Sequence, residues 1–185
     1  SVTIPSSVTA FGAMIFGLCT SIETINYNAN IDEGDGMFFF VGVGSNTPSG
    51  CKVIIGDNVE YIPEALFFTY QYDMFLGTNT NITELTISES VTSIGTGAFA
   101  GLVNLEKLYY NANITEDFTE DDMIFIGIGQ NRESCEVIIG DNVENIPAYL
   151  FASAYDNQFE LRSGITKLTV GTNLQAIGAY AFMMC

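Results

Sequence analysis

Residues 53–60 read Val-Ile-Ile-Gly-Asp-Asn-Val-Glu, and residues 137–144 carry the same eight residues in the same order. Extended to Phe67 and Phe151, the two stretches agree at 12 of 15 positions. A spacing of 83 residues likewise separates Val2, Leu85 and Leu168. The chain is therefore built from a long repeated unit, which is typical of solenoid and other repeat architectures.

A shorter unit lies within the long one and is anchored on the last apolar residue of each predicted strand. Apolar residues stand two positions before this anchor and four and seven positions after it, and a phenylalanine stands twelve positions after it. Five segments obey this template, with anchors at Ile4, Ile55, Ile87, Ile139 and Val170. One unit cannot bury its apolar side alone, so successive units are expected to stack around a continuous core.

Two further segments follow the template loosely. Their strands begin at Ile25 and Leu108, and each then runs through a glycine-containing apolar stretch, at 38–44 and 123–129. The seven strand starts are spaced by 23, 28, 32, 23, 29 and 31 residues. Alternation predicts that both ends of each strand face inward and its middle outward. The phenylalanine column is expected on the return leg, after a tight turn into a short helix, as a stack of rings.

Residues 85–99 read Leu-Thr-Ile-Ser-Glu-Ser-Val-Thr-Ser-Ile-Gly-Thr-Gly-Ala-Phe. This stretch resembles the BspA-like leucine-rich repeat of bacterial and protozoal surface proteins. Residues 1–19 and 167–185 match the same pattern, and the latter ends Ala-Phe-x-x-Cys, as that family often does. The resemblance covers nearly the whole chain, and it implies a secreted or cell-surface protein that serves in adhesion or in binding a host protein.

We therefore predict a BspA-like leucine-rich-repeat solenoid of about seven coils, formed by residues 1–185 as a single domain. A parallel β-sheet lines one face, and short helical turns and loops line the other. The chain stops in mid-pattern at Phe182, so we interpret it as a piece of a longer chain. Neither end carries a polar capping coil. We therefore expect the exposed ends to be covered by further chain or by end-to-end self-association.

The composition excludes several classes of function. Five Lys and Arg against 22 Asp and Glu give a net charge of −17, which argues against nucleic acid and anionic lipid as partners. There is no His, the usual general base, metal ligand and pH switch. No stretch reaches the ~18–20 consecutive apolar residues of a membrane span. The sequence therefore predicts a protein that is not an enzyme, takes no cofactor and is not inserted in a membrane.

Two exposed rows are predicted on the open face of the sheet. The first row holds the middle residue of each strand: Thr3, Asn26, Ile54, Thr86, Tyr109, Ile138 and Thr169. The second row holds the exposed residue two positions earlier: Ser1, Thr24, Lys52, Glu84, Lys107, Glu136 and Lys167. The last five members of the second row alternate in sign at the ~4.8 Å spacing of neighbouring strands.

Each row has a structural and a functional interpretation. The charged row is either a cross-strand ladder, worth about 0.2–1 kcal/mol per pair, or a polar contact row for a ligand. Ile54, Tyr109 and Ile138 are either ordinary strand formers or anchors for a partner, because Tyr is enriched at interfaces. The candidate binding residues are these three together with the charged members of the second row, which are Lys52, Lys107, Lys167, Glu84 and Glu136.

The acidic surplus gathers in inserts at 32–36 and 116–122. Oxygen ligands at short spacing can hold Ca²⁺, but neither insert has the spacing of an EF-hand loop. A solvated acidic rim is therefore the expected structure and a calcium site is the alternative. Asn81 and Asn113 each open an Asn-Ile-Thr sequence that fits the acceptor pattern for N-glycosylation.

The four cysteines have restricted pairing options. Cys51 and Cys135 lead into strands three steps apart, about 14 Å, whereas a disulfide needs Cα atoms within ~7 Å. Cys19 and Cys51 precede neighbouring strands and are the only feasible pair. However, Cys19 and Cys185 share a repeat position with Leu102, which favours free buried thiols. No pair of cysteines has the two-residue spacing that is typical of zinc sites.

Two functions from different classes follow. The first is an adhesin-like module, extracellular or at the cell surface, that binds a host or extracellular protein, or a glycan, through the sheet face and the acidic rim. The alternative is a set of structural spacer repeats within a longer surface protein, with no ligand of their own. A carbohydrate-active fragment is a weaker third, since many carboxylates are present but a solenoid has no obvious deep pocket.

Overall fold

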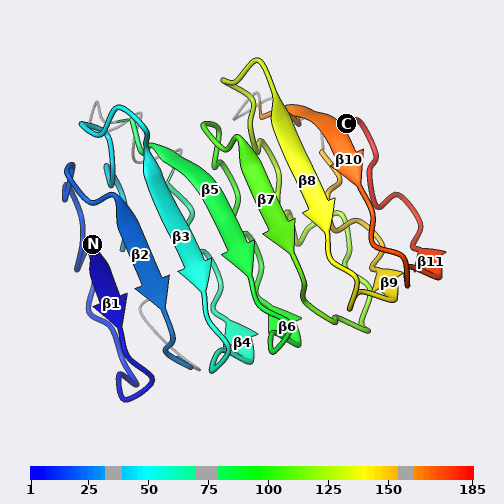
Figure 1. The fold of residues 1–185 in the computed structure, drawn as a ribbon, viewed down its shortest axis with the longest axis horizontal. Coiled ribbons are helices and arrows are strands. Elements are labelled where there is room, and N and C mark those ends of the chain that lie inside the picture. The colour runs from blue at the N-terminus through cyan, green and yellow to red at the C-terminus, as the bar shows by residue number, and fades with distance from the viewer. Residues whose placement is uncertain (32–38, 70–78, 154–160) are drawn as a thin grey trace.

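The computed structural model describes residues 1–31, 39–69, 79–153 and 161–185. A seven-stranded parallel sheet forms one face of a solenoid, and its strands follow one another in chain order (Figure 1). These strands are β1 (Val2–Ile4), β2 (Thr24–Tyr27), β3 (Cys51–Ile55), β5 (Ile82–Ile87), β7 (Lys107–Tyr110), β8 (Cys135–Ile139) and β10 (Ile165–Thr169). Two further pairs are β4 (Tyr61–Ile62) with β6 (Ser93–Ile94) and β9 (Asn145–Ile146) with β11 (Ala176–Ile177).

The register of the main sheet is the one that the repeat predicts. One inward row passes through all seven strands and consists of Val2, Ile25, Val53, Leu85, Leu108, Val137 and Leu168. These are the seven strand starts defined from the sequence, so the spacing of the loose segments is confirmed along with that of the template. Because a slip of one residue would turn every inward side chain outward, the apolar row fixes this register.

Burial alternates along each strand. In β3, Cys51, Val53 and Ile55 are at most 1% exposed, whereas Lys52 and Ile54 between them face solvent. The edge strand β10 differs, because no strand lies on its far side, and its inward residue Leu168 is 41% exposed. The core therefore runs between the coils, and every inner coil is covered on both sides.

Stacked phenylalanine rings form the second layer of the core, on the return leg behind the sheet. Successive ring centroids lie 4.6–5.7 Å apart, and neighbouring ring planes differ by 4–24°. The rings belong to Phe16, Phe40, Phe67, Phe99, Phe125, Phe151 and Phe182. The stack confirms the prediction for the five template coils and extends it to the two loose ones through Phe40 and Phe125.

The return leg consists of turns, which refines the expectation of short helices. No helix occurs in the part of the chain that the structure describes. The N–H groups of Phe67 and Phe99 donate to Ala98 O at 2.8 Å and Ile124 O at 3.2 Å, both in the following coil. Because these N–H groups bond between coils, they are not available to the residue four positions earlier, as an α-helix requires.

A left-handed backbone recurs two residues before six of the stacked phenylalanines. Their φ angles are 44–62°, at Met14, Ala65, Gly97, Met123, Tyr149 and Tyr180. This conformation costs an L-residue roughly 1–2 kcal/mol, so the stacking of the coils must impose it. Met14, Met123 and Tyr180 are 39–59% exposed, and this column of the return leg therefore presents large apolar side chains to solvent.

Candidate binding surface on the sheet

The charged row of the sheet forms ion pairs between neighbouring strands. Lys52 Nζ lies 3.0 Å from Glu84 Oε2, and Lys107 Nζ lies 3.8 Å from Glu136 Oε2. Lys167 Nζ lies 2.6 Å from Glu136 Oε1, so two lysines flank one carboxylate. The hydrogen bond from Lys167, aided by the charges of both lysines, holds the pKa of Glu136 below its ordinary value. The alternating ladder predicted from the sequence is present.

The ion pairs of the ladder are exposed to solvent, which limits their contribution to stability. The lysine side chains are 39–65% exposed, and their glutamate partners are 20–31% exposed. Exposed ion pairs typically contribute about 0–1 kcal/mol. The row therefore fixes the positions of its charges more than it stabilises the fold.

The apolar residues of the other row fall into two groups. Tyr109 of β7 and Ile138 of β8 are direct neighbours in the sheet, and both are half-buried. Ile54 of β3 is 40% exposed and is separated from Tyr109 by Thr86 of β5. Lys107 Nζ lies 5.8 Å from the centre of the Tyr109 ring, within the range of a cation–π contact. Tyr109 and Ile138 thus form one apolar step beside the ladder, and Ile54 stands apart.

An arginine network borders the ladder, and the sequence analysis missed it. Arg132 lies 3.2 Å from Glu106 Oε1, donates to Asn81 Oδ1 at 2.7 Å and donates to Asn104 O at 2.9 Å. Asn104 in turn donates to Thr80 O at 2.8 Å. This network holds together the loops that lead into β5, β7 and β8. Only the scarcity of basic residues, five in the chain, singles out Arg132 in the sequence.

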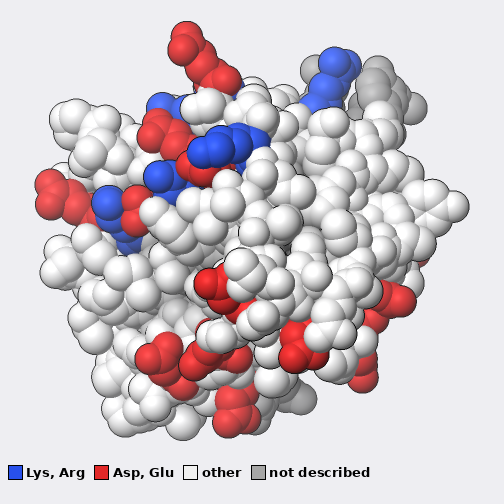
Figure 2. All heavy atoms as spheres, turned by 45° about the vertical axis from the view of Figure 1, so that its right-hand side comes forward, with Lys and Arg blue, Asp and Glu red and all other residues white. Residues whose placement is uncertain are grey.

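Charge is segregated along the strand direction. Lys52 and Lys107 lie at the start of β3 and β7 and Lys167 lies in the middle of β10, whereas Asp57 and Asp141 lie in the turns that follow β3 and β8. In the view of Figure 2 the basic side chains lie in the upper half, among acidic ones, and the lower half shows only acidic side chains. The side of the sheet at which the strands begin is therefore nearly neutral. The side at which they end, which we call the negative edge, is strongly negative.

Several carboxylates outside the strands have structural partners. Asp122 Oδ2 accepts from the N–H of Thr119 at 2.7 Å and from its hydroxyl at 2.8 Å. Burial acts to raise the pKa of Asp122, but hydrogen bonds from Thr119 and Thr96 hold the pKa below its ordinary value. Asp117 Oδ1 accepts from the N–H of Ala148 at 2.8 Å. Within the described ranges no group of three metal-ligating side chains could hold an ion, and the insert at 32–36 lies outside them.

The four cysteines are free thiols. Burial raises the pKa of the Cys51 and Cys135 thiols to about 12, so neither is a thiolate near neutral pH. Cys19 is partly buried, as its shared repeat position predicts, but Cys185 is exposed because no coil covers it.

The two glycosylation sequences differ in access. Asn81 is held on both sides of its amide, since it accepts from Arg132 and donates to Thr47 O at 3.2 Å. Thr83, the hydroxyl residue of the same sequence, is 6% exposed. Asn113 and Thr115 of the second sequence are exposed. In the folded chain only the second sequence is open to solvent.

A family model described as the BspA type leucine-rich repeat region matches in six copies over residues 1–116 and 70–185. The chain belongs to the BspA-type leucine-rich-repeat family. Repeats of this family generally serve in binding at surfaces and are typically binding or scaffold domains rather than enzymes. No curated protein and no solved structure gives a significant match. Among the described residues, no helix has the length and apolar character needed to span a bilayer.

Proposed function

We propose that this chain is a binding module of a surface-exposed or secreted protein, and that its contact surface is the sheet face. The observation that carries the proposal is the apolar step of Tyr109 and Ile138 beside a row of fixed, alternating charges. A partner protein would cover the step, and a few anchors of this kind supply most of the affinity of an interface. We propose an extracellular or host protein as the partner, with a glycan as the second candidate.

The charged row would contribute specificity. Its members are already paired across strands, so a partner gains little by replacing a pair but must match the order of signs. The negative edge would act at longer range, because a chain with net charge −17 attracts partners with basic patches and speeds encounter at low salt. The surface thus has three parts: the apolar step anchors the partner, the charged row selects it, and the negative edge attracts it at long range.

The test is a binding screen of the purified chain against extracellular-matrix proteins and glycans at low and high salt. A saturable signal that persists at high salt is expected, since the apolar step is insensitive to screening. The variant Tyr109→Thr with Ile138→Thr keeps residues that favour strands and should lose at least tenfold in affinity.

The matched control is Leu18→Asn, which removes an apolar side chain that is 52% exposed on the return leg. Asn tolerates the left-handed backbone of that position, where φ is 61°. Equal loss of signal in both variants would contradict a sheet-face site. Silence from a folded chain across the whole screen would favour the spacer function instead.

A further inference from the structure

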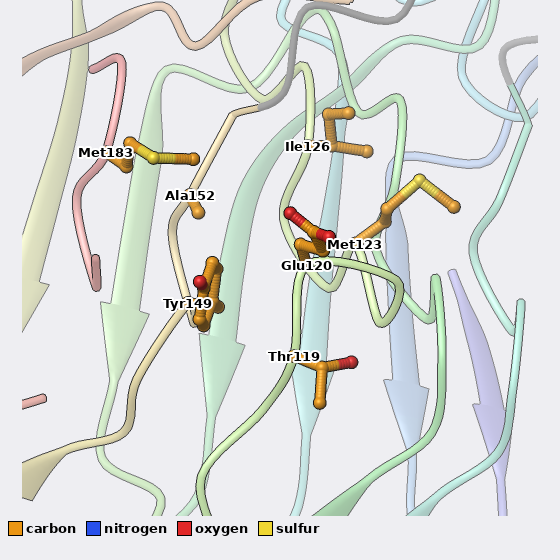
Figure 3. Close-up of a pocket in the computed structure, with 7 residues that line it drawn as sticks. All are labelled: Thr119, Glu120, Met123, Ile126, Tyr149, Ala152 and Met183. Carbon is orange, nitrogen blue, oxygen red and sulfur yellow. The ribbon is translucent and has the colours of Figure 1, made fainter. Parts of the chain in front are cut away.

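A shallow hollow lies on the return-leg side of the molecule, away from the sheet face, and its volume is about 10 Å³, room for one water molecule. Pockets for small organic ligands usually measure about 300–1,000 Å³, so this hollow does not enclose such a ligand. Its lining comes from three successive return legs and consists of Thr119, Glu120, Met123, Ile126, Tyr149, Ala152 and Met183 (Figure 3).

The lining is apolar apart from Thr119, the Tyr149 hydroxyl and one carboxylate. Figure 3 shows Glu120 between two groups, with Tyr149 and Ala152 on one side and Met123 and Ile126 on the other. Ile126 is 3% exposed and forms part of a small second core, whereas Met123 is 39% exposed. A side chain that lay across this hollow would therefore contact a thioether, an aromatic ring and a carboxylate at once.

Glu120 is available for a partner. Within the described part of the chain, the structure gives its carboxylate no hydrogen bond and no ion pair, unlike the neighbouring Asp122. The pKa of Tyr149 is raised, chiefly by desolvation and then by the nearby Tyr180 and the carboxylate of Glu120. The three lysines and Arg132 pair with glutamates at the sheet and in the loops before it, and none of these ion pairs among the described residues involves Glu120.

The left-handed backbone at Met123 and Tyr149 explains how the hollow is built. Their φ angles are 44° and 58°, and the same conformation recurs in the return leg of other coils. This places side chains of successive coils in one column, where Tyr149 also meets Tyr180 with ring centroids 5.0 Å apart. The rings and the thioether are therefore held by the stacking of the coils rather than by a free loop.

The chemistry of this lining suits a guanidinium group. A guanidinium is planar, stacks on a tyrosine ring, and can pair with a carboxylate through two parallel hydrogen bonds. The methylene stem of an arginine covers apolar surface while its head stays wet, which fits Met123 and Ile126 beside Glu120. A lysine ammonium is a compact, strongly hydrated charge that can approach the ring, but it has no planar face to stack on it and no second parallel hydrogen bond for the carboxylate.

We propose that an arginine side chain from the surface of a protein partner lies across this hollow. Glu120 pairs with the guanidinium, the Tyr149 ring stacks on it, and Met123 and Ile126 contact the stem. This contact is independent of the sheet face, because the two surfaces lie on opposite sides of the coils. The chain can therefore hold two partners, or two parts of one partner, at the same time.

The test uses the chain labelled with ¹⁵N and titrated with the capped tripeptide Ac-Gly-Arg-Gly-NH₂, followed by amide chemical shifts. Shifts are expected to concentrate at Glu120, Met123 and Tyr149 and to saturate at millimolar concentrations. The same tripeptide with citrulline, which has the shape of arginine without its charge, should produce no saturable shift. The lysine tripeptide should bind at least threefold more weakly than the arginine tripeptide.

Two variants separate the hollow from the general negative field. Glu120→Gln should weaken the arginine tripeptide at least threefold, whereas Asp121→Asn, the same change at the next and equally exposed position, should leave its affinity within experimental error. Equal effects of the two variants, equal binding of the lysine tripeptide, or shifts spread evenly over the acidic edge would each overturn the proposal.

Discussion

The template coils and the two loose coils reach the same interior by different residues. In the template coils the last inward strand residue is aliphatic, as at Ile55 and Ile139, and the stacked phenylalanine follows it after 12 positions. In the loose coils this residue is tyrosine, Tyr27 in β2 and Tyr110 in β7, and the stacked phenylalanine follows after 13 and 15 positions. Both tyrosine rings are fully buried and meet stacked phenylalanines edge-on at centroid distances of 5.8–6.4 Å. A solenoid of this kind therefore tolerates variable spacing if each coil still supplies one ring to the stack.

Removing one stacked ring from each kind of coil should have the largest effect on stability. Phe125→Ala in a loose coil should cost as much as Phe99→Ala in a template coil, about 3–5 kcal/mol of unfolding free energy, because both leave a buried cavity. Urea unfolding followed by circular dichroism measures both. Phe182→Ala at the partly covered end is the control and should cost clearly less. A small cost for Phe125→Ala would mean that the loose coils do not share the core.

Alkaline unfolding should separate the two kinds of coil by their buried acids. Burial raises the pKa of Cys51 and Cys135, which open template strands, from about 9 to about 12. The unfolded chain then loses its protons first as pH rises, so stability present below pH ~9 falls by up to ~1.4 kcal/mol per pH unit for each thiol until about pH 12. Thermal melting from pH 8 to 11 measures the slope, and Cys51→Ala with Cys135→Ala should remove its onset near pH 9.

The same melting series addresses the loose coils. Burial raises the pKa of Tyr27 and Tyr110 well above the ordinary tyrosine value of 10.0, so their contribution is lost only above pH ~10. Tyr27→Phe with Tyr110→Phe should therefore reduce the fall above pH 10 and leave the onset near pH 9 unchanged. If the tyrosine substitutions instead removed the loss of stability that begins near pH 9, that loss would have to be assigned to the tyrosines and not to the thiols.

Removing either hydroxyl should also stabilise the chain at neutral pH. Neither Tyr27 nor Tyr110 has a hydrogen-bond partner for its buried hydroxyl among the described residues. An unpaired buried hydroxyl costs about 1–3 kcal/mol, so Tyr110→Phe should raise the unfolding free energy by an amount of this order. Tyr109→Phe, at the half-buried outward position next to it, is the control and should change little. A destabilised Tyr110→Phe variant would indicate a partner for the hydroxyl, such as a buried water.

The smallest effect belongs to the outward charged row. Glu136→Gln removes the carboxylate shared by Lys107 and Lys167 and should cost no more than about 0.5–1 kcal/mol at low salt. The difference should shrink as salt is added, because the pairs are solvent-exposed. A loss comparable to that of Phe99→Ala would show that the ladder, and not the ring stack, holds the coils together.

The sequence predicts the parts of the molecule that depend on periodicity. Strand starts, sheet register and the charged row all follow from the spacing of apolar residues, because each coil repeats the environment of its neighbour. The template does not predict the rings of Phe40 and Phe125, since their distance from the strand differs from it. Phe40, Phe99 and Phe125 share the sequence Phe-x-Gly, which identifies them as equivalent. In all three coils the glycine two positions after the phenylalanine has φ near 75°.

Other features depend on the path of the loops and not on the repeat. Arg132 meets Asn81, 51 residues away, because two loops converge before the strands. The hollow at Glu120 needs an insert, a template coil and the last coil together, and no motif within one coil encodes it. Helices were expected from small residues on the return leg, but bonds between coils occupy the N–H groups that a helix would use.

The inter-strand hydrogen bonds of the main sheet point along the axis of the solenoid, and the two termini lie at opposite ends of that axis (Figure 1). Tension applied through the termini would therefore break the hydrogen bonds of one pair of neighbouring strands at a time. It would not shear the bonds of many strands together. Each coil that opened would release the 23–32 residues between neighbouring strand starts, about 80–110 Å of extended chain. Under a pull between two attached bodies, such a domain would lengthen in steps while its remaining coils kept their folded surface.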